Sequence, residues 1–188
     1  MPLWGWVVIA VVVLAVVAGA VWGVRRKRRT GSLRGAFGPE YERTVADAGN
    51  RKRAESELEE RQQRRAGMDI RQLDPAARER FRRAWSAAQT EFVDSPAKAT
   101  READLLVAEV MRDRGYPMED FEQRAADISV DHPEVVANYR AAHGVSLAND
   151  QGKASTEDLR RAMVHYRSLF EELLEAEDTV PSQSDQQR

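Results

Sequence analysis

The residues best suited to acid–base or metal chemistry are three histidines, His132, His143 and His165, and the many carboxylates of the C-terminal third. No two of these histidines are four residues apart, the spacing that puts two imidazole ligands on one helix face, as in H-E-x-x-H zinc proteins. His143 and His165 could still meet across two helices, with a carboxylate such as Glu172 nearby. That pocket would make the protein a small-ligand sensor or hydrolase, our alternative hypothesis. Packed or capping histidines are favoured, because no ligand motif surrounds them, and we expect no metal site.

Other signatures of catalysis or cofactor binding are absent from the sequence. The chain has no cysteine, which excludes disulfides, thiolate catalysis and cysteine metal sites. No Gly-rich phosphate loop follows a strand, and neither G-x-S-x-G nor a calcium-loop pattern occurs. The acidic pair Glu171-Glu172 is better explained as a solvated helix face than as an acid/base pair. We therefore expect a non-enzymatic protein without catalytic residues or cofactors.

The clearest element in the sequence is an uncharged apolar stretch at the N-terminus, from Leu3 to Val24. As a helix it would span about 33 Å, enough for a hydrocarbon core of about 30 Å. The sequence therefore predicts a transmembrane helix over 3–24. Ala18-Gly19-Ala20 resembles a signal-peptide cleavage site, but no Lys or Arg precedes the apolar stretch, so an uncleaved anchor is favoured.

A basic run follows this predicted helix and consists of Arg25, Arg26, Lys27, Arg28 and Arg29. Because Lys and Arg resist translocation, the run predicts a single-pass protein of the cell membrane with its N-terminus outside and its C-terminal domain in the cytoplasm. The inverted topology is the alternative. The same five side chains could also bind anionic lipid headgroups, although fixing the topology is the simpler role.

Small residues recur every fourth position in the predicted membrane helix, at Ala15, Gly19 and Gly23. They share one helix face, and the two glycines match the G-x-x-x-G pattern of closely packed membrane helices. Small residues are common in such helices in any case. Our hypothesis is a homodimer that forms through this face.

The remainder of the chain is acidic. Five of the 29 Lys and Arg residues lie within the first 30 positions, which leaves 24 against 31 Asp and Glu and a formal charge of about −7. No basic face or stripe is evident beyond the juxtamembrane run and a short cluster at 51–53. We expect no nucleic-acid partner.

Two segments connect the anchor to the compact part. Residues 25–50 are rich in Gly and predict a basic juxtamembrane neck and linker with at most a short helix after Pro39. Residues 51–67 predict a charged helical spacer, which Asn50 can cap. Ala54 and Leu58 are its sole apolar residues at helical spacing, so the spacer should be solvated.

The region 68–177 has the pattern of about five helices, with start signals such as Asp74-Pro75 and a capping-box-like pair, Ser155 and Asp158. No segment alternates with the period of a strand, so we expect an all-α, bundle-like domain. Residues 178–188 are polar and predict a disordered tail. The apolar positions expected to face the core are Phe81, Trp85, Ala88, Phe92, Ala99, Ala103, Leu106, Val107, Val110, Met111, Phe121, Ala125, Ile128, Val136, Tyr139, His143, Leu147, Leu159, Met163, Tyr166, Phe170 and Leu173.

Four short strings give the chain a resemblance to other proteins. They are Phe37-Gly38-Pro39-Glu40-Tyr41, Arg112-Asp113-Arg114-Gly115-Tyr116-Pro117, Asp131-His132-Pro133 and Ala162-Met163-Val164-His165-Tyr166-Arg167. With them the chain resembles a group of uncharacterised single-pass membrane proteins of high-GC Gram-positive, actinobacterial bacteria. The resemblance covers most of the chain after the anchor. It implies membrane attachment and a helical domain, and no activity or cofactor.

An anchor, a spacer and a compact acidic domain without catalytic chemistry favour one function. We expect a membrane-anchored helical protein-interaction or scaffold module, with an unknown protein partner at the cytoplasmic face.

Overall fold

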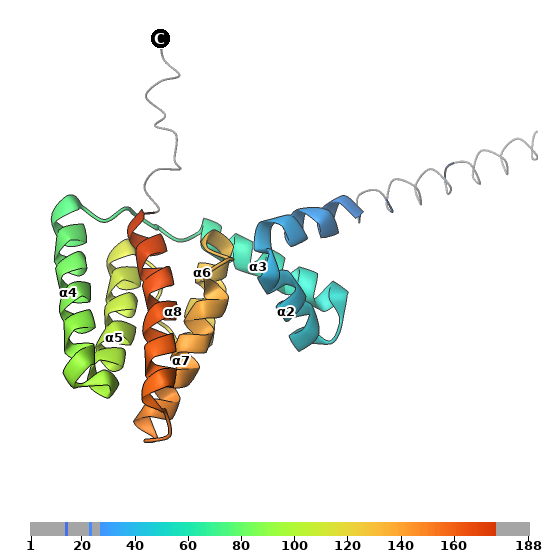
Figure 1. Ribbon diagram of the computed structural model, residues 1–188. Helices are drawn as coiled ribbons and strands as arrows, with labels where there is room; N and C mark the ends of the chain where they lie inside the picture. The colour runs from blue at the N-terminus through green and yellow to red at the C-terminus, as the bar shows by residue number, and fades with distance from the viewer. Residues whose placement is uncertain (1–13, 15–22, 24–26, 176–188) are drawn as a thin grey trace, which may run out of the picture. The chain divides into compact units, whose positions relative to one another are not determined.

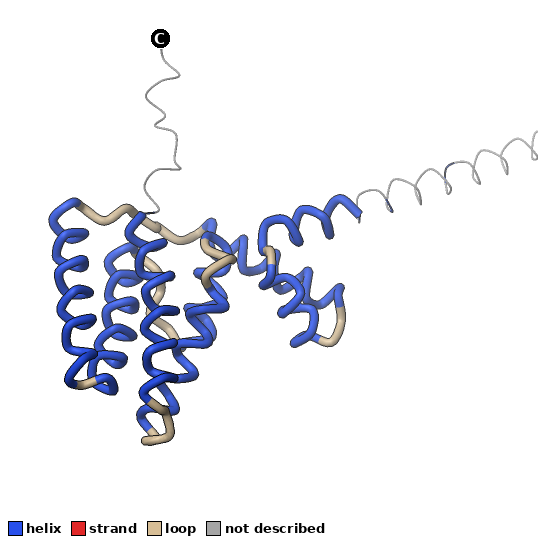
Figure 2. Tube along the Cα trace, in the orientation of Figure 1, coloured by secondary structure: helices blue, strands red, loops and turns tan. Residues whose placement is uncertain are grey.

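The computed structural model describes residues 14, 23 and 27–175, and this part of the chain is helical, without a strand (Figures 1 and 2). The all-α prediction is confirmed. The chain divides into two compact units, one up to Glu59 and one from Glu60 onward. The helices are α2 (Pro39–Ala48), α3 (Arg51–Ala66), α4 (Pro75–Asp94), α5 (Pro96–Arg114), α6 (Phe121–Asp131), α7 (Val136–Asp150) and α8 (Thr156–Glu175).

The first unit consists of a helical segment over residues 27–37, followed by α2 and the first part of α3. Gly49 ends α2 in the left-handed conformation, with φ 65°, where a glycine is favoured. The side chain of Asn50 then accepts a hydrogen bond from the backbone N–H of Lys52 at 2.8 Å and caps α3, as predicted.

The first unit corrects two sequence-based expectations. The neck holds more than a short helix after Pro39, since residues 27–37 are helical as well. The spacer is not simply solvated either, because Ala54 and Leu58 are 0% exposed. Leu33 and Phe37, on the helix that the sequence did not predict, are also buried. A few large side chains from the segment 27–37, α2 and α3 thus form a core, which the sequence of any one of these helices alone does not predict.

Two carboxylates are buried within this unit, those of Glu40 and Glu55. Glu55 accepts hydrogen bonds from the hydroxyls of Thr30, at 2.7 Å, and Tyr41, at 3.0 Å. A buried carboxylate is costly unless hydrogen-bonded, so these two donors tie the segment 27–37 and α2 to α3.

In the second unit, α5 is the shared helix. It packs against α4, α8 and α7, while α7 also packs along α8 and against the short α6 (Figure 1). The second unit starts at Glu60, within α3, rather than at residue 68 as the sequence predicted. The last turns of α3 belong to it through contacts with α6.

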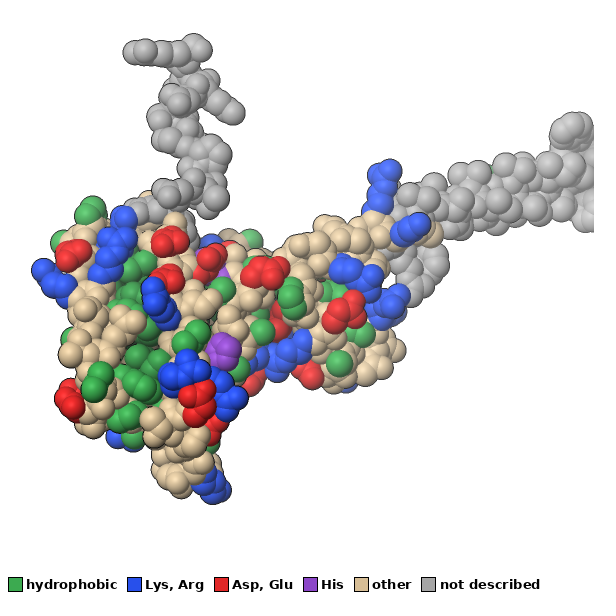
Figure 3. Space-filling model, viewed as in Figure 1, with side chains coloured by type: hydrophobic (Ala, Val, Ile, Leu, Met, Phe, Trp, Pro, Cys, Tyr) green, Lys and Arg blue, Asp and Glu red, His purple; other side chains and the backbone are tan. Residues whose placement is uncertain are grey.

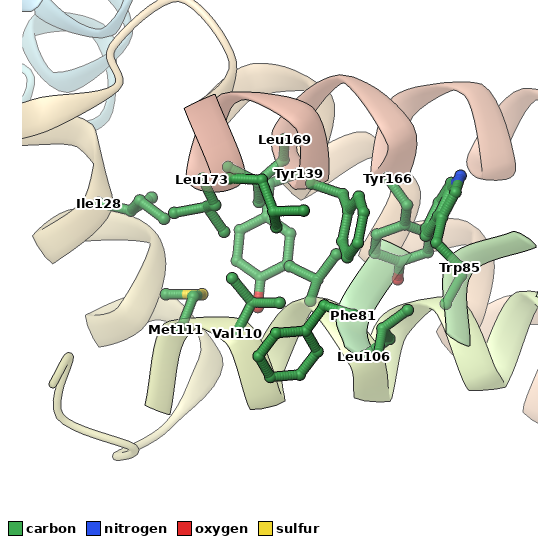
Figure 4. Packing of buried hydrophobic residues seen from close by; sticks show 14 of the residues in the cluster. Phe81, Trp85, Leu106, Val110, Met111, Ile128, Tyr139, Tyr166, Leu169 and Leu173 are labelled. Atoms are coloured by element: carbon green, nitrogen blue, oxygen red, sulfur yellow. The ribbon is translucent and has the colours of Figure 1, made fainter. Parts of the chain in front are cut away.

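The predicted apolar stripes form the core of this second unit. Figure 4 shows Phe81, Val110, Tyr139 and Leu169 meeting from four different helices. The prediction for α7 was wrong at Leu147, which is 51% exposed. Its neighbours Val145 and Ser146 are half-buried and buried, so Leu147 lies on the outer face of α7.

The helix starts follow the predicted capping signals. Asp74 accepts a hydrogen bond from the N–H of Ala77 at 2.8 Å. Ser155 and Asp158 form a reciprocal capping box, in which each backbone N–H donates to the side chain of the other, at 3.0 and 3.2 Å. Asp substitutes for the more usual Glu there.

The predicted transmembrane helix 3–24 lies outside the described residues except for Leu14 and Gly23, and the tail 178–188 lies outside them altogether. Across the part of the chain that is described, no helix combines the length and the hydropathy needed to cross a bilayer.

Replacement of Gly115 should lower the stability of the second unit. Gly115 ends α5 with φ 95°, and a Cβ there would lie 2.4 Å from the backbone oxygen of Asp69. We predict that Gly115→Ala lowers the free energy of unfolding by about 2 kcal/mol or more, through left-handed strain and the clash together. Thermal denaturation followed by circular dichroism measures the loss.

Gly152→Ala is the matched control. Gly152 has φ 67°, but no atom lies within 4 Å of its added Cβ, so we expect backbone strain alone, about 1 kcal/mol. Equal losses for the two variants would contradict the role given to the close approach of Asp69.

Candidate functional site

The proposed lipid-binding residues are described in part. Lys27, Arg28 and Arg29 are exposed or nearly so, and Arg29 forms an ion pair with Glu59 of the same unit. Arg25 and Arg26 lie outside the described residues.

The proposed dimer face is described at one position. A Cβ added at Gly23 would have no atom within 4 Å, whereas Ala15 and Gly19 lie outside the described residues. The dimer hypothesis therefore stays a prediction.

The histidines are arranged differently from the pocket that the sequence allowed. Glu172, the carboxylate expected near His143 and His165, lies 3.2 Å from Nδ1 of His132 instead. The ring of His143 is stacked on Phe121 with 3.7 Å between centroids, so that ring face is covered. Among the described residues, no group of three His, Asp or Glu side chains could hold a metal ion.

Two of the strings that carry the resemblance meet in space. The hydroxyl of Tyr116 donates to Oδ2 of Asp131 at 2.7 Å, which joins the end of α5 to the end of α6. Nε of Arg65, from the last turn of α3, lies 2.5 Å from the same oxygen. Burial and the Asp131 charge raise the pKa of Tyr116, which keeps its hydroxyl protonated as a donor.

His132 and Arg114 extend this contact to α8. Nη1 of Arg114 donates to the backbone oxygen of Leu173 at 2.9 Å, and His132 contacts Glu172 one residue earlier. We call Arg114, Tyr116, Asp131, His132 and Glu172 the terminal polar cluster. Its groups join the ends of three helices, α5, α6 and α8.

A further feature of the second unit is an apolar hollow that is open to solvent. It encloses about 180 Å³ and is lined by Gln89 and Phe92 of α4 and by Arg160, Met163, Val164 and Arg167 of α8. Figure 3 shows hydrophobic side chains gathered along this face, between α4 and α8 as labelled in Figure 1.

Another hollow continues along the same two helices. It encloses about 240 Å³ and is lined by Arg82, Trp85, Phe170, Glu171, Leu174 and Glu175. We name the two hollows together the α4–α8 groove.

Trp85 and Phe170 bridge the two helices within the groove. Their rings stack with 4.7 Å between centroids and 20° between planes. Trp85 is 6% exposed, and its indole N–H has no acceptor among the described residues. In Figure 4 that nitrogen points away from the other labelled side chains.

The sequence assigned these aromatic residues to the core, and Trp85 and Phe170 are buried as expected. It missed Val164, which is 55% exposed beside Met163 in the same hollow. One signal in the sequence could have indicated it: Val164 is apolar, but it lies next to the apolar stripe of α8 and outside it, on the side expected to face solvent.

Comparisons of the chain with protein-family models, with curated proteins and with solved structures found no match.

The terminal polar cluster predicts a specific pH dependence. Burial lowers the pKa of His132, and the positive Arg114 adds to this, while Glu172 and Asp131 oppose it. The unfolded chain then binds a proton more readily than the folded one, so stability is full above the unfolded pKa of about 6.5 and is lost as the pH falls through it. We expect His132→Gln to flatten the dependence of unfolding free energy on pH between about 7.5 and 5.5.

His165→Gln is the control for this prediction. His165 lies half-buried on α8 outside the cluster, so this variant should keep the wild-type slope. Urea denaturation at a series of pH values gives both slopes. If His132→Gln and wild type had the same slope, the buried neutral imidazole would not be the cause.

Proposed function

We propose that this protein is a membrane-anchored helical module that binds a partner protein at the cytoplasmic face of the cell membrane. The observation that carries the proposal is the α4–α8 groove, which is open to solvent and lined in part by apolar side chains of α4 and α8. Rimmed apolar surfaces of this kind are typical of protein-binding sites.

The size of each hollow supports binding by side chains rather than by a large cofactor. An apolar cavity of about 150 Å³ accommodates benzene. Hollows of about 180 and 240 Å³ therefore suit one large apolar side chain each. Phe92, Met163 and Val164 would supply the apolar contacts in the smaller one.

The anchor is the second part of the proposal. The uncharged stretch 3–24 and the basic residues after it support a single membrane span with the module on the cytoplasmic side. The exposed Lys27 and Arg28 are available to anionic headgroups. A homodimer through Ala15, Gly19 and Gly23 would bring two grooves to one site on the membrane.

The alternative, a ligand sensor or hydrolase, has less support. It needs His143 or His165 in a polar pocket with a carboxylate. Oδ2 of Asp104 does lie 3.7 Å from Nδ1 of His143, but Asp104 also accepts a hydrogen bond from Tyr166. One face of the His143 ring is stacked on Phe121, and Glu172 contacts His132 instead. One hollow of the groove is mainly apolar, and the other combines Trp85, Phe170 and Leu174 with charged side chains, which suits a protein surface better than a reacting substrate.

Deletion of residues 1–24 should release the protein from the membrane. We expect the full-length chain to stay in the membrane pellet after alkaline carbonate extraction and the deletion variant to appear in the supernatant. A C-terminal tag on the full-length chain should resist protease added to intact cells and become sensitive after lysis. Digestion of the tag in intact cells would show that the topology is inverted. Extraction of the full-length chain by carbonate would contradict the membrane anchor.

Val164→Glu should remove partner binding while leaving the fold intact. The side chain at this position is largely exposed, so a carboxylate there costs little stability but introduces a charge into the apolar hollow. Proximity labelling from the C-terminus should enrich specific proteins around the wild type, and that enrichment should fall at least about fivefold in the variant.

Leu147→Glu is the matched control, because Leu147 is similarly exposed but lies on α7, outside the lining of the groove. It should label like the wild type. Equal enrichment around wild type and Val164→Glu would count against the groove as the binding surface.

A further inference from the structure

The two hollows of the α4–α8 groove are built from equivalent positions one heptad apart. On α4, Arg82 and Trp85 line one hollow, and Gln89 and Phe92, each seven residues later, line the other. On α8, Phe170, Glu171 and Leu174 line the first hollow, and Met163, Val164 and Arg167, each seven residues earlier, line the second.

This repeat fixes a spacing along the groove. The residue order on the two helices shows that they run antiparallel, and seven residues of helix correspond to about 10.5 Å. Apolar side chains at positions i and i+7 of another helix recur on one face at nearly the same distance. In an extended strand, two residues about three positions apart would be separated by this distance.

We propose that the α4–α8 groove binds an amphipathic α-helix of a partner protein, which inserts two large apolar side chains seven residues apart. This inference rests on the proposed function and names the chemistry of the partner. One anchor occupies the hollow of Phe92, Met163 and Val164. The other occupies the hollow beside the Trp85–Phe170 stack.

The charges along the groove add a second requirement. The hollow of Met163 has Arg160 and Arg167 at its margin, whereas the other hollow has Glu171 and Glu175, with Arg82 opposite. The two α8 arginines pair with Glu157 and Glu171, but these ion pairs are exposed and exchange partners at little cost. The partner helix therefore carries carboxylates beside one anchor and basic residues beside the other.

Shape favours a partner helix over a second copy of this chain. A single helix is a convex ridge that fills a groove between two antiparallel helices. The same groove on a second copy is also concave, so two grooves placed face to face would leave both hollows unfilled.

The test uses the full-length protein in detergent micelles and synthetic helical peptides of about 18 residues with a fluorescent label. The matching peptide has two Leu anchors seven residues apart, Glu beside one and Lys beside the other. We expect saturable binding by fluorescence anisotropy with Kd below about 100 μM. A peptide of the same composition with its anchors five residues apart, on different helix faces, should bind at least about tenfold more weakly.

Variants of the protein locate the peptide. Val164→Glu should weaken binding at least about tenfold and Leu147→Glu should leave it unchanged. Arg160→Glu combined with Arg167→Glu should reverse the preference, so that a peptide with Lys beside both anchors binds better than the matching one.

Three outcomes would overturn the helical partner. They are equal binding of the two anchor spacings, no saturable binding of the matching peptide up to about 1 mM, and a dimer of the wild-type chain that Val164→Glu dissociates in analytical ultracentrifugation. The last would assign the groove to a second copy. If the peptides fail while proximity labelling still depends on Val164, the proposed function stands and the partner is not a helix of this pattern.

Discussion

The packing of α5 is the constraint on which the rest of the second unit depends. Ala99, Ala103, Val107 and Val110 are fully buried along this helix, and their small side chains let neighbouring helices approach closely. α4 and α8 both pack against α5. Each is therefore positioned by the helix between them, and the surfaces that they turn toward each other are bridged by the Trp85–Phe170 stack with a hollow on either side. The groove is a consequence of this arrangement, since closing it would draw one of the two helices away from α5.

The terminal polar cluster keeps the helix ends in register with that core. Gly115 lets the chain turn closely against Asp69 after α5, and Tyr116 then reaches Asp131. Arg114, Tyr116, Asp131 and His132 thus each make a contact that joins helix ends. Burial lowers the pKa of the His132 imidazole in this cluster, which favours its neutral form.

Periodicity and capping chemistry made most of the second unit predictable from sequence. Apolar residues at helical spacing identify the face that is turned inward, and residues such as Asp74 and Ser155 mark where a helix begins, because both are local properties. The first unit was harder. Its helices are short, and Leu58 looked isolated until the segment 27–37 supplied a buried Leu33 and Phe37.

The candidate site depends on contacts between residues far apart in the chain. The pairing of His132 with Glu172, 40 positions away, and the hollow beside Val164 follow from how helices are placed, which a pattern within one helix does not encode. The sequence predicted a protein-interaction module because it lacks catalytic motifs, but it indicated no candidate surface for a partner.

Whether a protein covers the α4–α8 groove in the cell can be measured directly by the accessibility of a single thiol. The chain has no cysteine, so Val164→Cys and Leu147→Cys each introduce one unique site. In the purified protein, both thiols should react with a membrane-permeant maleimide at similar rates. In intact cells, we predict that the thiol at position 164 reacts several-fold more slowly than in the purified protein, while the rate at position 147 is unchanged. Equal rates at position 164 in cells and in the purified protein would contradict it.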